Sequence, residues 1–164
     1  MLTYLPVPIG YPIFQYSKDS DKPKVLGAEE IEAGPEEAEL LRCPVGQRWF
    51  KVESTPMVHI HAFVPPAYAG FLRIMTTRRE PMYTSIESVY GEQILEVEQD
   101  FRAVIISARQ ARILKVKAGS AGLYVIRHYI GGGSRLVLVT LSVYPADRFS
   151  YAMRLRYNPQ STKE

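Results

Sequence analysis

Cysteine is nearly absent from this chain of 164 residues, in which Cys43 is the single example. A lone thiol excludes an internal disulfide framework and any zinc site built from several cysteines. It also fits the reducing conditions of a cytoplasm. Because 46% of the residues are hydrophobic and 23% are charged, we expect a folded domain held together by an ordinary apolar core.

Long apolar runs are missing as well. The run over residues 136–143 contains Thr140 and Ser142 and is far shorter than the roughly 20 residues that a membrane helix needs. Residues 1–16 are apolar, but prolines break them and no basic start precedes them, unlike a secretory signal. We therefore expect a soluble, cytoplasmic protein.

The charge is small and evenly spread. The formal net charge is +3, and Arg78 and Arg79 form the one notable basic pair. A dedicated nucleic-acid binder would show a basic patch or stripe. We therefore interpret the charges as solvated surface and do not expect this chain to bind DNA by itself.

The order of apolar patterns and turn residues predicts an α+β domain. Pro35, followed by acidic residues, suits the start of a helix, Ser107 suits a helix N-cap, and Gly91 suits a helix end. Six or seven mostly antiparallel strands and three or four short helices follow from these patterns. The predicted strands cover residues 25–33, 47–53, 57–64, 94–106, 123–130, 136–144 and 151–157, and the predicted helices cover 35–41, 67–75, 81–90 and 108–116.

Two strands alternate clearly between an apolar face and a mixed face. In the first strand the mixed face would line a cavity or meet water, whereas the other face would be core. The apolar sets are Val58, Ile60, Ala62 and Val64 in one strand and Val137, Val139, Leu141 and Val143 in the other. The opposite sets are Met57, His59, His61 and Phe63, and Leu136, Leu138, Thr140, Ser142 and Tyr144.

The hydroxyls of Thr140 and Ser142 need hydrogen-bond partners if their strand is buried, because an unsatisfied buried polar group costs about 1–3 kcal/mol. A bound ligand would supply such partners, and so would the neighbouring strands. The pattern leaves both readings open.

His59 and His61 project to the same side of their strand, which raises the question of a metal site. Zinc sites use three or four protein ligands in most cases, and the sequence places neither Cys43 nor His128 near the pair. We therefore interpret both histidines as lining a pocket or meeting solvent, and expect neither a metal nor a cofactor.

Several segments resemble, in order, those of the UTRA domain, the effector-sensing part of HutC-type regulators in the GntR family of bacterial transcription regulators. The resemblance extends over roughly residues 25–157 and is most distinctive in its closing segment. The segments are Gly46-Gln47-Arg48-Trp49, Phe63-Val64-Pro65, Pro81-Met82-Tyr83 with Tyr90-Gly91, residues 96–103, Ala111 with Leu114 and Gly119, Arg127-His128-Tyr129, and Ser-Val-Tyr-Pro-Ala-Asp-Arg-Phe from Ser142 onward.

The resemblance implies a chorismate-lyase-like fold, in which a central, mostly antiparallel sheet of about six strands is flanked by short helices. It also implies a homodimer, a small-molecule effector held between sheet and helices, and no enzymatic activity. DNA would be bound through a winged helix-turn-helix that we do not find in this chain. We expect a linker over residues 1–24, the UTRA-like domain over 25–157 and a tail over 158–164.

The resemblance also suggests where an effector would bind. Tyr144 matches a pocket tyrosine, and Ser85 lies where a helix hydroxyl approaches the effector. His61 and Leu138 replace carboxylates, and Lys51 replaces an arginine, so an anionic or aromatic metabolite fits better than an amino sugar. The candidate effector-binding residues are Lys51, His59, His61, Phe63, Tyr83, Ser85, Thr140, Ser142 and Tyr144.

Two other classes of function remain as alternatives. A small enzyme on the same fold would need a carboxyl group facing cationic groups. We expect Glu96, Glu98 and Asp100 instead to be solvated or to face a dimer partner. No nucleophile–base pair is evident in the sequence. A dimerisation module without a ligand pocket would be told apart by its lack of response to any ligand.

Overall fold

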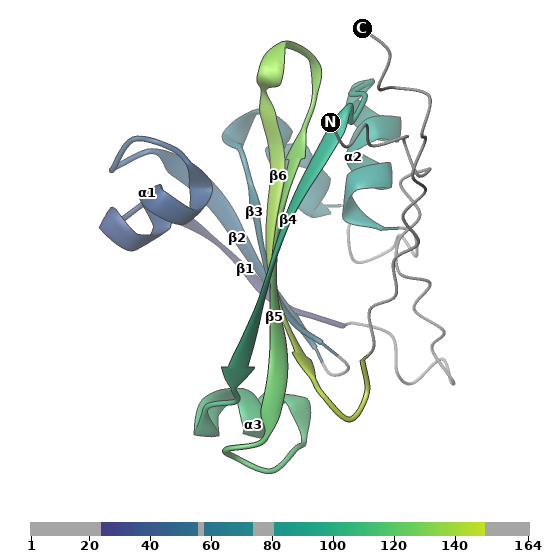
Figure 1. Cartoon of the computed structure of the whole chain (residues 1–164). Coiled ribbons are helices and arrows are strands. Elements are labelled where there is room, and N and C mark those ends of the chain that lie inside the picture. The colour runs from purple at the N-terminus through teal and green to yellow at the C-terminus, as the bar shows by residue number, and fades with distance from the viewer. Residues whose placement is uncertain (1–23, 56–57, 74–80, 150–164) are drawn as a thin grey trace, which may run out of the picture.

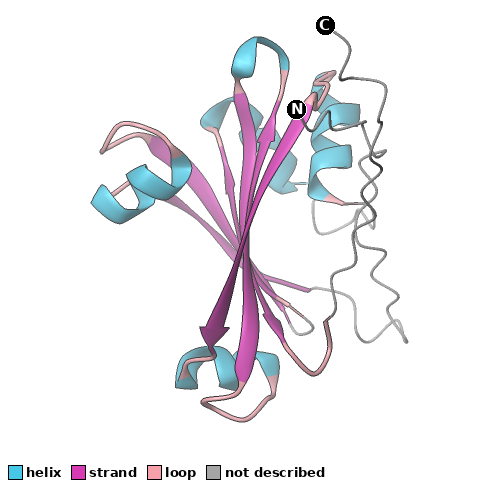
Figure 2. Cartoon of the chain, viewed as in Figure 1, coloured by secondary structure: helices cyan, strands magenta, loops and turns pink. Residues whose placement is uncertain are grey.

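Six antiparallel strands form one continuous sheet in the order β1-β2-β3-β6-β5-β4 (Figure 1). The computed structural model describes residues 24–55, 58–73 and 81–149. The strands are β1 (Lys24–Glu32), β2 (Arg48–Thr55), β3 (His59–Val64), β4 (Glu96–Ile105), β5 (Ala121–Ile130) and β6 (Leu136–Pro145). The helices are α1 (Pro35–Leu41), η2 (Pro66–Arg73), α2 (Met82–Tyr90), α3 (Ala108–Leu114) and η3 (Gly132–Ser134), of which η2 and η3 are 3₁₀ helices (Figure 2).

These elements confirm the predicted α+β class within the described residues. Six of the seven predicted strands are present, and the helix predicted over 67–75 is the 3₁₀ helix η2. The seventh strand, predicted over 151–157, and the tail lie outside the described residues. So does the expected linker, apart from Lys24, which begins β1.

The helix ends follow local chemistry that the sequence displays. Ser107 accepts a hydrogen bond from the backbone N–H of Gln110, and the Gln110 side chain accepts one from the N–H of Ser107, which together form a capping box at the start of α3. Helix α2 ends at Tyr90 and is followed by Gly91, whose φ of 66° lies in the left-handed region that glycine adopts without steric cost. Both predicted helix signals are therefore confirmed.

The central strands of the sheet are buried on both faces, and helices on opposite sides cover them (Figure 1). Directly opposed residues of neighbouring strands share a face, so the strand register assigns each side chain to one of the two. We call the side covered by α1 and α3 the α1 face; its core residues include Trp49, Phe63, Val139, Leu141 and Val143. We call the side covered by η2 and α2 the α2 face; its core residues include Val52, Ala62, Val64, Tyr129 and Leu138.

The predicted alternation holds in β3 and fails at the start of β6. In β3, Ala62 and Val64 belong to the α2 face, whereas Phe63 belongs to the α1 face. In β6, Leu136 is opposite Ile130 but Leu138 is opposite Tyr129, so Val137 is an extra residue at a bulge.

The prediction that Val137 shares a face with Val139, Leu141 and Val143 is therefore wrong. Val137 packs into the α2-face core together with Leu138, and Leu136 packs against the α1-face core. A bulge shifts the alternation by one residue on one side of it, and nothing local in the sequence marks its position.

The acidic residues of β4 are partly or fully exposed, and two of them form ion pairs. Glu98 pairs with Arg42 at 2.5 Å, and Asp100 pairs with Arg102 at 2.6 Å. This arrangement agrees with the interpretation of these carboxylates as solvated. None of the helices in the described part of the chain is long and apolar enough to cross a membrane.

Candidate functional site

The nine residues expected to line one pocket fall on opposite faces of the sheet. In the register of β3 and β6, His61 is opposite Leu141 on the α1 face, whereas Thr140 is opposite Ala62 on the α2 face. A side chain on one face cannot reach a ligand on the other, because the sheet lies between them. A single pocket formed by the histidines and Thr140 is therefore excluded.

Each face of the sheet holds several of the nine candidate residues. The α1 face holds Lys51, His59, His61 and Phe63. The α2 face holds Thr140, Ser142 and Tyr144 from β6, and helix α2 on that side carries Tyr83 and Ser85.

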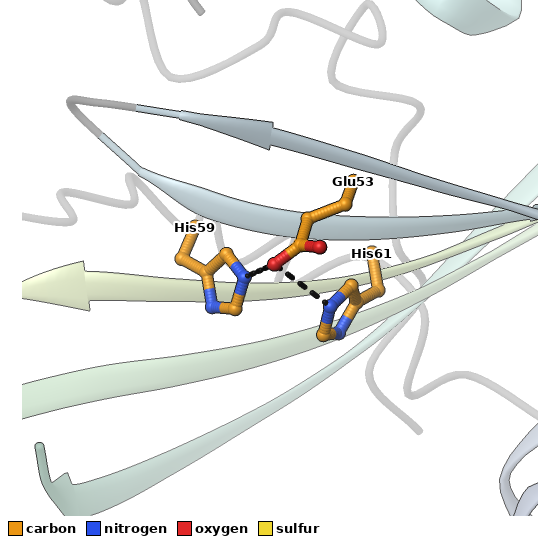
Figure 3. A group of neighbouring side chains, drawn as sticks. All are labelled: Glu53, His59 and His61. Carbon is orange, nitrogen blue, oxygen red and sulfur yellow. Dashed lines mark hydrogen bonds and ion pairs between the residues drawn. The ribbon is translucent and has the colours of Figure 1, made fainter. Parts of the chain in front are cut away.

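On the α1 face, two histidines and a glutamate point toward one another (Figure 3). His59 Nε2–H donates a hydrogen bond to Glu53 Oε1 at 2.6 Å, and His61 Nε2 lies 3.6 Å from the same oxygen. The imidazole rings of His59 and His61 meet edge to face with their centroids 4.6 Å apart. Glu53 is the neighbour that sequence reasoning missed: it is opposite His61 only because β2 and β3 pair in this register.

The surroundings of this cluster favour a neutral His61 and a charged Glu53. Burial, and after it the nearby basic groups of His59 and Lys51, lowers the pKa of His61 to about 4. The hydrogen bond from His59 lowers the pKa of Glu53 below its ordinary value. At neutral pH, His61 therefore offers an uncharged imidazole nitrogen and Glu53 offers a carboxylate.

A cavity of about 330 Å³ adjoins the two histidines. Gln110 of α3 and Tyr124 of β5 contribute its other polar groups, and aliphatic side chains of β4 and β6 complete the lining. The remaining predicted residue of this strand, Phe63, is 3% exposed and packs in the core with Trp49 and Leu41. Its surroundings are those of a core residue.

On the α2 face, a buried arginine lies among polar side chains. Arg127 of β5 is 5% exposed. Its Nε–H donates to Gln99 Oε1 at 2.7 Å, and its Nη1–H donates to the Tyr144 hydroxyl at 3.3 Å. Its Nη2 is buried without a hydrogen-bond partner among the described residues, and so is the hydroxyl of Thr140, which is directly opposite Arg127 in the sheet.

Aromatic rings lie beside this polar group. The rings of Tyr83 and Tyr129 stack with centroids 5.5 Å apart and planes inclined by 17°, which joins helix α2 to the sheet. Burial raises the pKa of Tyr129 to about 12, so its hydroxyl keeps its proton at neutral pH. Ser85 and Ser142 are also buried on this side.

Arg127 and Gln99 were not among the candidate residues from the sequence. In the sequence, Arg127 stands out only as part of a family segment, although a charged residue within the apolar strand 123–130 is itself a signal. A buried guanidinium must be compensated by hydrogen bonds or by an anion. The α2 face can therefore bind an anionic group, whereas the α1-face cluster can bind a cation or a proton.

Comparison with known proteins agrees with this fold. The UTRA domain model matches residues 22–150. A ligand-binding domain assigned to a GntR-family transcriptional regulator from Bordetella bronchiseptica is 24% identical, with a TM-score of 0.72 and coverage of 82% of this chain and 88% of that chain.

Two further structures show the same architecture. A GntR-family transcriptional regulator from Bacillus cereus has a TM-score of 0.72 at 14% identity, with coverage of 82% of this chain and 98% of that chain. One from Enterococcus faecalis has a TM-score of 0.69 at 18% identity, with coverage of 81% and 99%. These neighbours are regulator proteins, not enzymes, and the match to the family model extends over most of the chain; the chain belongs to the UTRA domain family.

Proposed function

We propose that this chain is the effector-sensing domain of a GntR-type transcription regulator and that its effector is a small anionic metabolite bound on the α2 face. The effector's carboxylate or phosphate would pair with Arg127. The membership of the UTRA family and the regulator neighbours support the class of function. The residues around Arg127 support the choice of face and the charge of the ligand.

The buried guanidinium of Arg127 is the observation that carries the proposal. Arginine recognises carboxylates and phosphates through two parallel N–H···O bonds. Arg127 uses Nε and Nη1 for Gln99 and Tyr144, and its buried Nη2 lacks a partner among the described residues. Leaving such a donor unsatisfied costs about 1–3 kcal/mol, and an anionic ligand would recover that cost.

The neighbouring groups would set the rest of the ligand's position. The hydroxyl of Thr140 is directly opposite Arg127 and can hydrogen-bond the same ligand. The stacked rings of Tyr83 and Tyr129 offer an aromatic wall, which suits a ligand with a planar or apolar part. Both features agree with the expectation of an anionic or aromatic metabolite.

The regulatory step would be a shift between two arrangements of a homodimer. An effector that binds one arrangement more tightly raises its population and so changes the spacing of the DNA-binding halves. In this proposal, DNA is bound by an N-terminal winged helix-turn-helix domain of the regulator. The sensor domain contributes the differential affinity.

A thermal-shift screen tests this proposal. The purified chain is screened against organic acids, amino-acid derivatives, aromatic acids and sugar phosphates, with product analysis for each hit. A ligand at 100 times its Kd stabilises the folded state by about 2.7 kcal/mol, which raises the melting temperature of a domain of this size by several degrees.

Two arginine variants decide where a hit binds. Arg127→Met removes the buried guanidinium, and Arg102→Met removes an exposed one on the neighbouring strand, where Arg102 pairs with Asp100. We expect the shift to disappear in Arg127→Met and to persist in Arg102→Met. A shift that persists in Arg127→Met would refute the proposed site, a product would indicate an enzyme, and no shift with any ligand would favour a ligand-blind dimerisation module.

A further inference from the structure

We propose that Glu53, His59 and His61 form a binding site for a divalent transition-metal ion such as Zn²⁺ on the α1 face, separate from the effector site. The nearest ligand atoms of the three side chains all lie within 4.8 Å of one another (Figure 3). The proposal is independent of the proposed effector, because it involves the opposite face of the sheet.

The types and spacing of the donors fit zinc chemistry. Zn²⁺ binds imidazole nitrogen at about 2.0–2.1 Å and carboxylate oxygen at about 2.0–2.2 Å, so neighbouring donors of a tetrahedral site lie roughly 3.3 Å apart. His61 Nε2 and Glu53 Oε1 are 3.6 Å apart. His59 Nε2 and the same oxygen are 2.6 Å apart, so the two atoms would separate by about 0.7 Å to admit the ion. The proton of their hydrogen bond would leave Nε2, and the neutral ring would carry its proton on Nδ1 instead.

The backbone holds the three donors in place before any ion binds. Glu53 and His61 are directly opposite each other in the β2–β3 pair, and His59 lies two residues from His61 on the same strand. The side chain of His59 is 3% exposed, and those of His61 and Glu53 are 21% and 25% exposed. An ion would reach this position without unfolding the sheet, and its ligands would lose little conformational freedom.

The donor types of the cluster favour a transition metal over calcium. Neutral imidazole is a good ligand for zinc, copper and nickel, whereas calcium requires six to eight oxygen donors. Arg109 lies 3.4 Å from Glu53 Oε1, and Lys51 lies on the same face of the sheet as His61; both cations oppose a bound ion.

Arg109 competes with a metal ion for the carboxylate of Glu53. It extends from α3, its side chain is 67% exposed, and it can turn into solvent when an ion takes Glu53. The adjoining cavity of about 330 Å³ leaves room for water or a small donor to complete the coordination. With three protein ligands, the ion would keep at least one position for such a donor.

Zn²⁺ titration of the metal-free chain by calorimetry tests the site, with Co²⁺ absorption as a second readout. We expect one ion per chain, and an affinity at least tenfold lower in Glu53→Gln and in His61→Asn. Arg109→Gln, which removes the competing cation, should bind Zn²⁺ as tightly or more tightly. Circular dichroism and thermal melting establish that each variant is folded.

Two control variants use the chain's other potential soft ligands. His128, whose Nε2–H donates to the Leu40 carbonyl at 2.7 Å, is replaced by glutamine, and Cys43 is replaced by serine. Both should keep the affinity of the unmodified chain. The proposal fails if no ion binds, if Glu53→Gln and His61→Asn bind like the controls, if Arg109→Gln binds more weakly, or if Ca²⁺ binds as well as Zn²⁺.

Discussion

Replacing Arg127 by methionine tests whether its guanidinium serves ligand binding or stabilises the fold. Hydrogen bonds to a charged group contribute about 1.5–3 kcal/mol each. The bond to Gln99 is short at 2.7 Å, whereas the bond to Tyr144 is long at 3.3 Å. We therefore assign the pair roughly 3–4.5 kcal/mol, with the second bond at the low end of the range for one bond.

The cost of burying the charge opposes this contribution. Removing a charged group from water costs several kcal/mol even after relaxation, and Arg127 is 5% exposed with one nitrogen lacking a partner among the described residues. Methionine keeps the apolar stem and removes both the two hydrogen bonds and the cost of burying the charge. We expect the free energy of unfolding to change by no more than about 1 kcal/mol, or about 2–4 °C in melting temperature.

Urea unfolding measures this difference directly. Trp49 is the single tryptophan, is 1% exposed and lies on the other face of the sheet, so its fluorescence reports global unfolding. Breaking a buried, fully satisfied ion pair typically costs about 3–5 kcal/mol. A loss of that size in Arg127→Met would refute the reasoning and make Arg127 a structural residue.

Three further changes test the fold around the two faces. Ile86→Ala in the α2-face core removes a side chain that is fully buried and should lower the free energy of unfolding by about 2–5 kcal/mol in urea titration; a loss under 1 kcal/mol would contradict the tight packing of α2. Ser107→Ala removes the capping box of α3 and should cost about 1 kcal/mol, seen as a melting temperature lower by about 2–4 °C, whereas Ser107→Asp should restore it. Glu92 accepts hydrogen bonds from Tyr68 at 2.7 Å and from Arg135, and the Tyr68 bond, then Arg135, lowers its pKa below the ordinary value of 4.5. Because a lowered carboxyl pKa stabilises the fold above the unfolded pKa and loses this effect as the pH falls through the folded value, Glu92→Gln should melt below the unmodified chain at pH 7, and the gap should narrow as the pH falls below 4.5; a gap that is independent of pH would contradict this.

Local patterns predicted the elements of this domain well. The alternation of residues 58–64 placed His59, His61 and Phe63 on one side of a strand, as the structure shows. Ser107 and Gly91 marked a helix start and a helix end correctly. These features depend on neighbours within a few residues, where side-chain periodicity and backbone sterics act directly.

These local patterns could not predict which residues come together in each candidate site. Alternation tells which residues of one strand share a face, but it does not tell which face of the next strand joins them. That choice depends on strand order and register, and a shift of one residue exchanges the two faces. The histidines and Thr140 were therefore grouped together, although the pairing of β3 with β6 separates them.

The sequence by itself determined the α+β class, most of the strands and helices, and the family to which the chain belongs. The tertiary structure alone brought Glu53 opposite His61, buried Arg127 opposite Thr140, and placed the bulge that turns Val137 to the other face. The physical reason is the separation of the contacting residues along the sequence. Helices and strands form through contacts between near neighbours, whereas both candidate sites are assembled by pairing between strands.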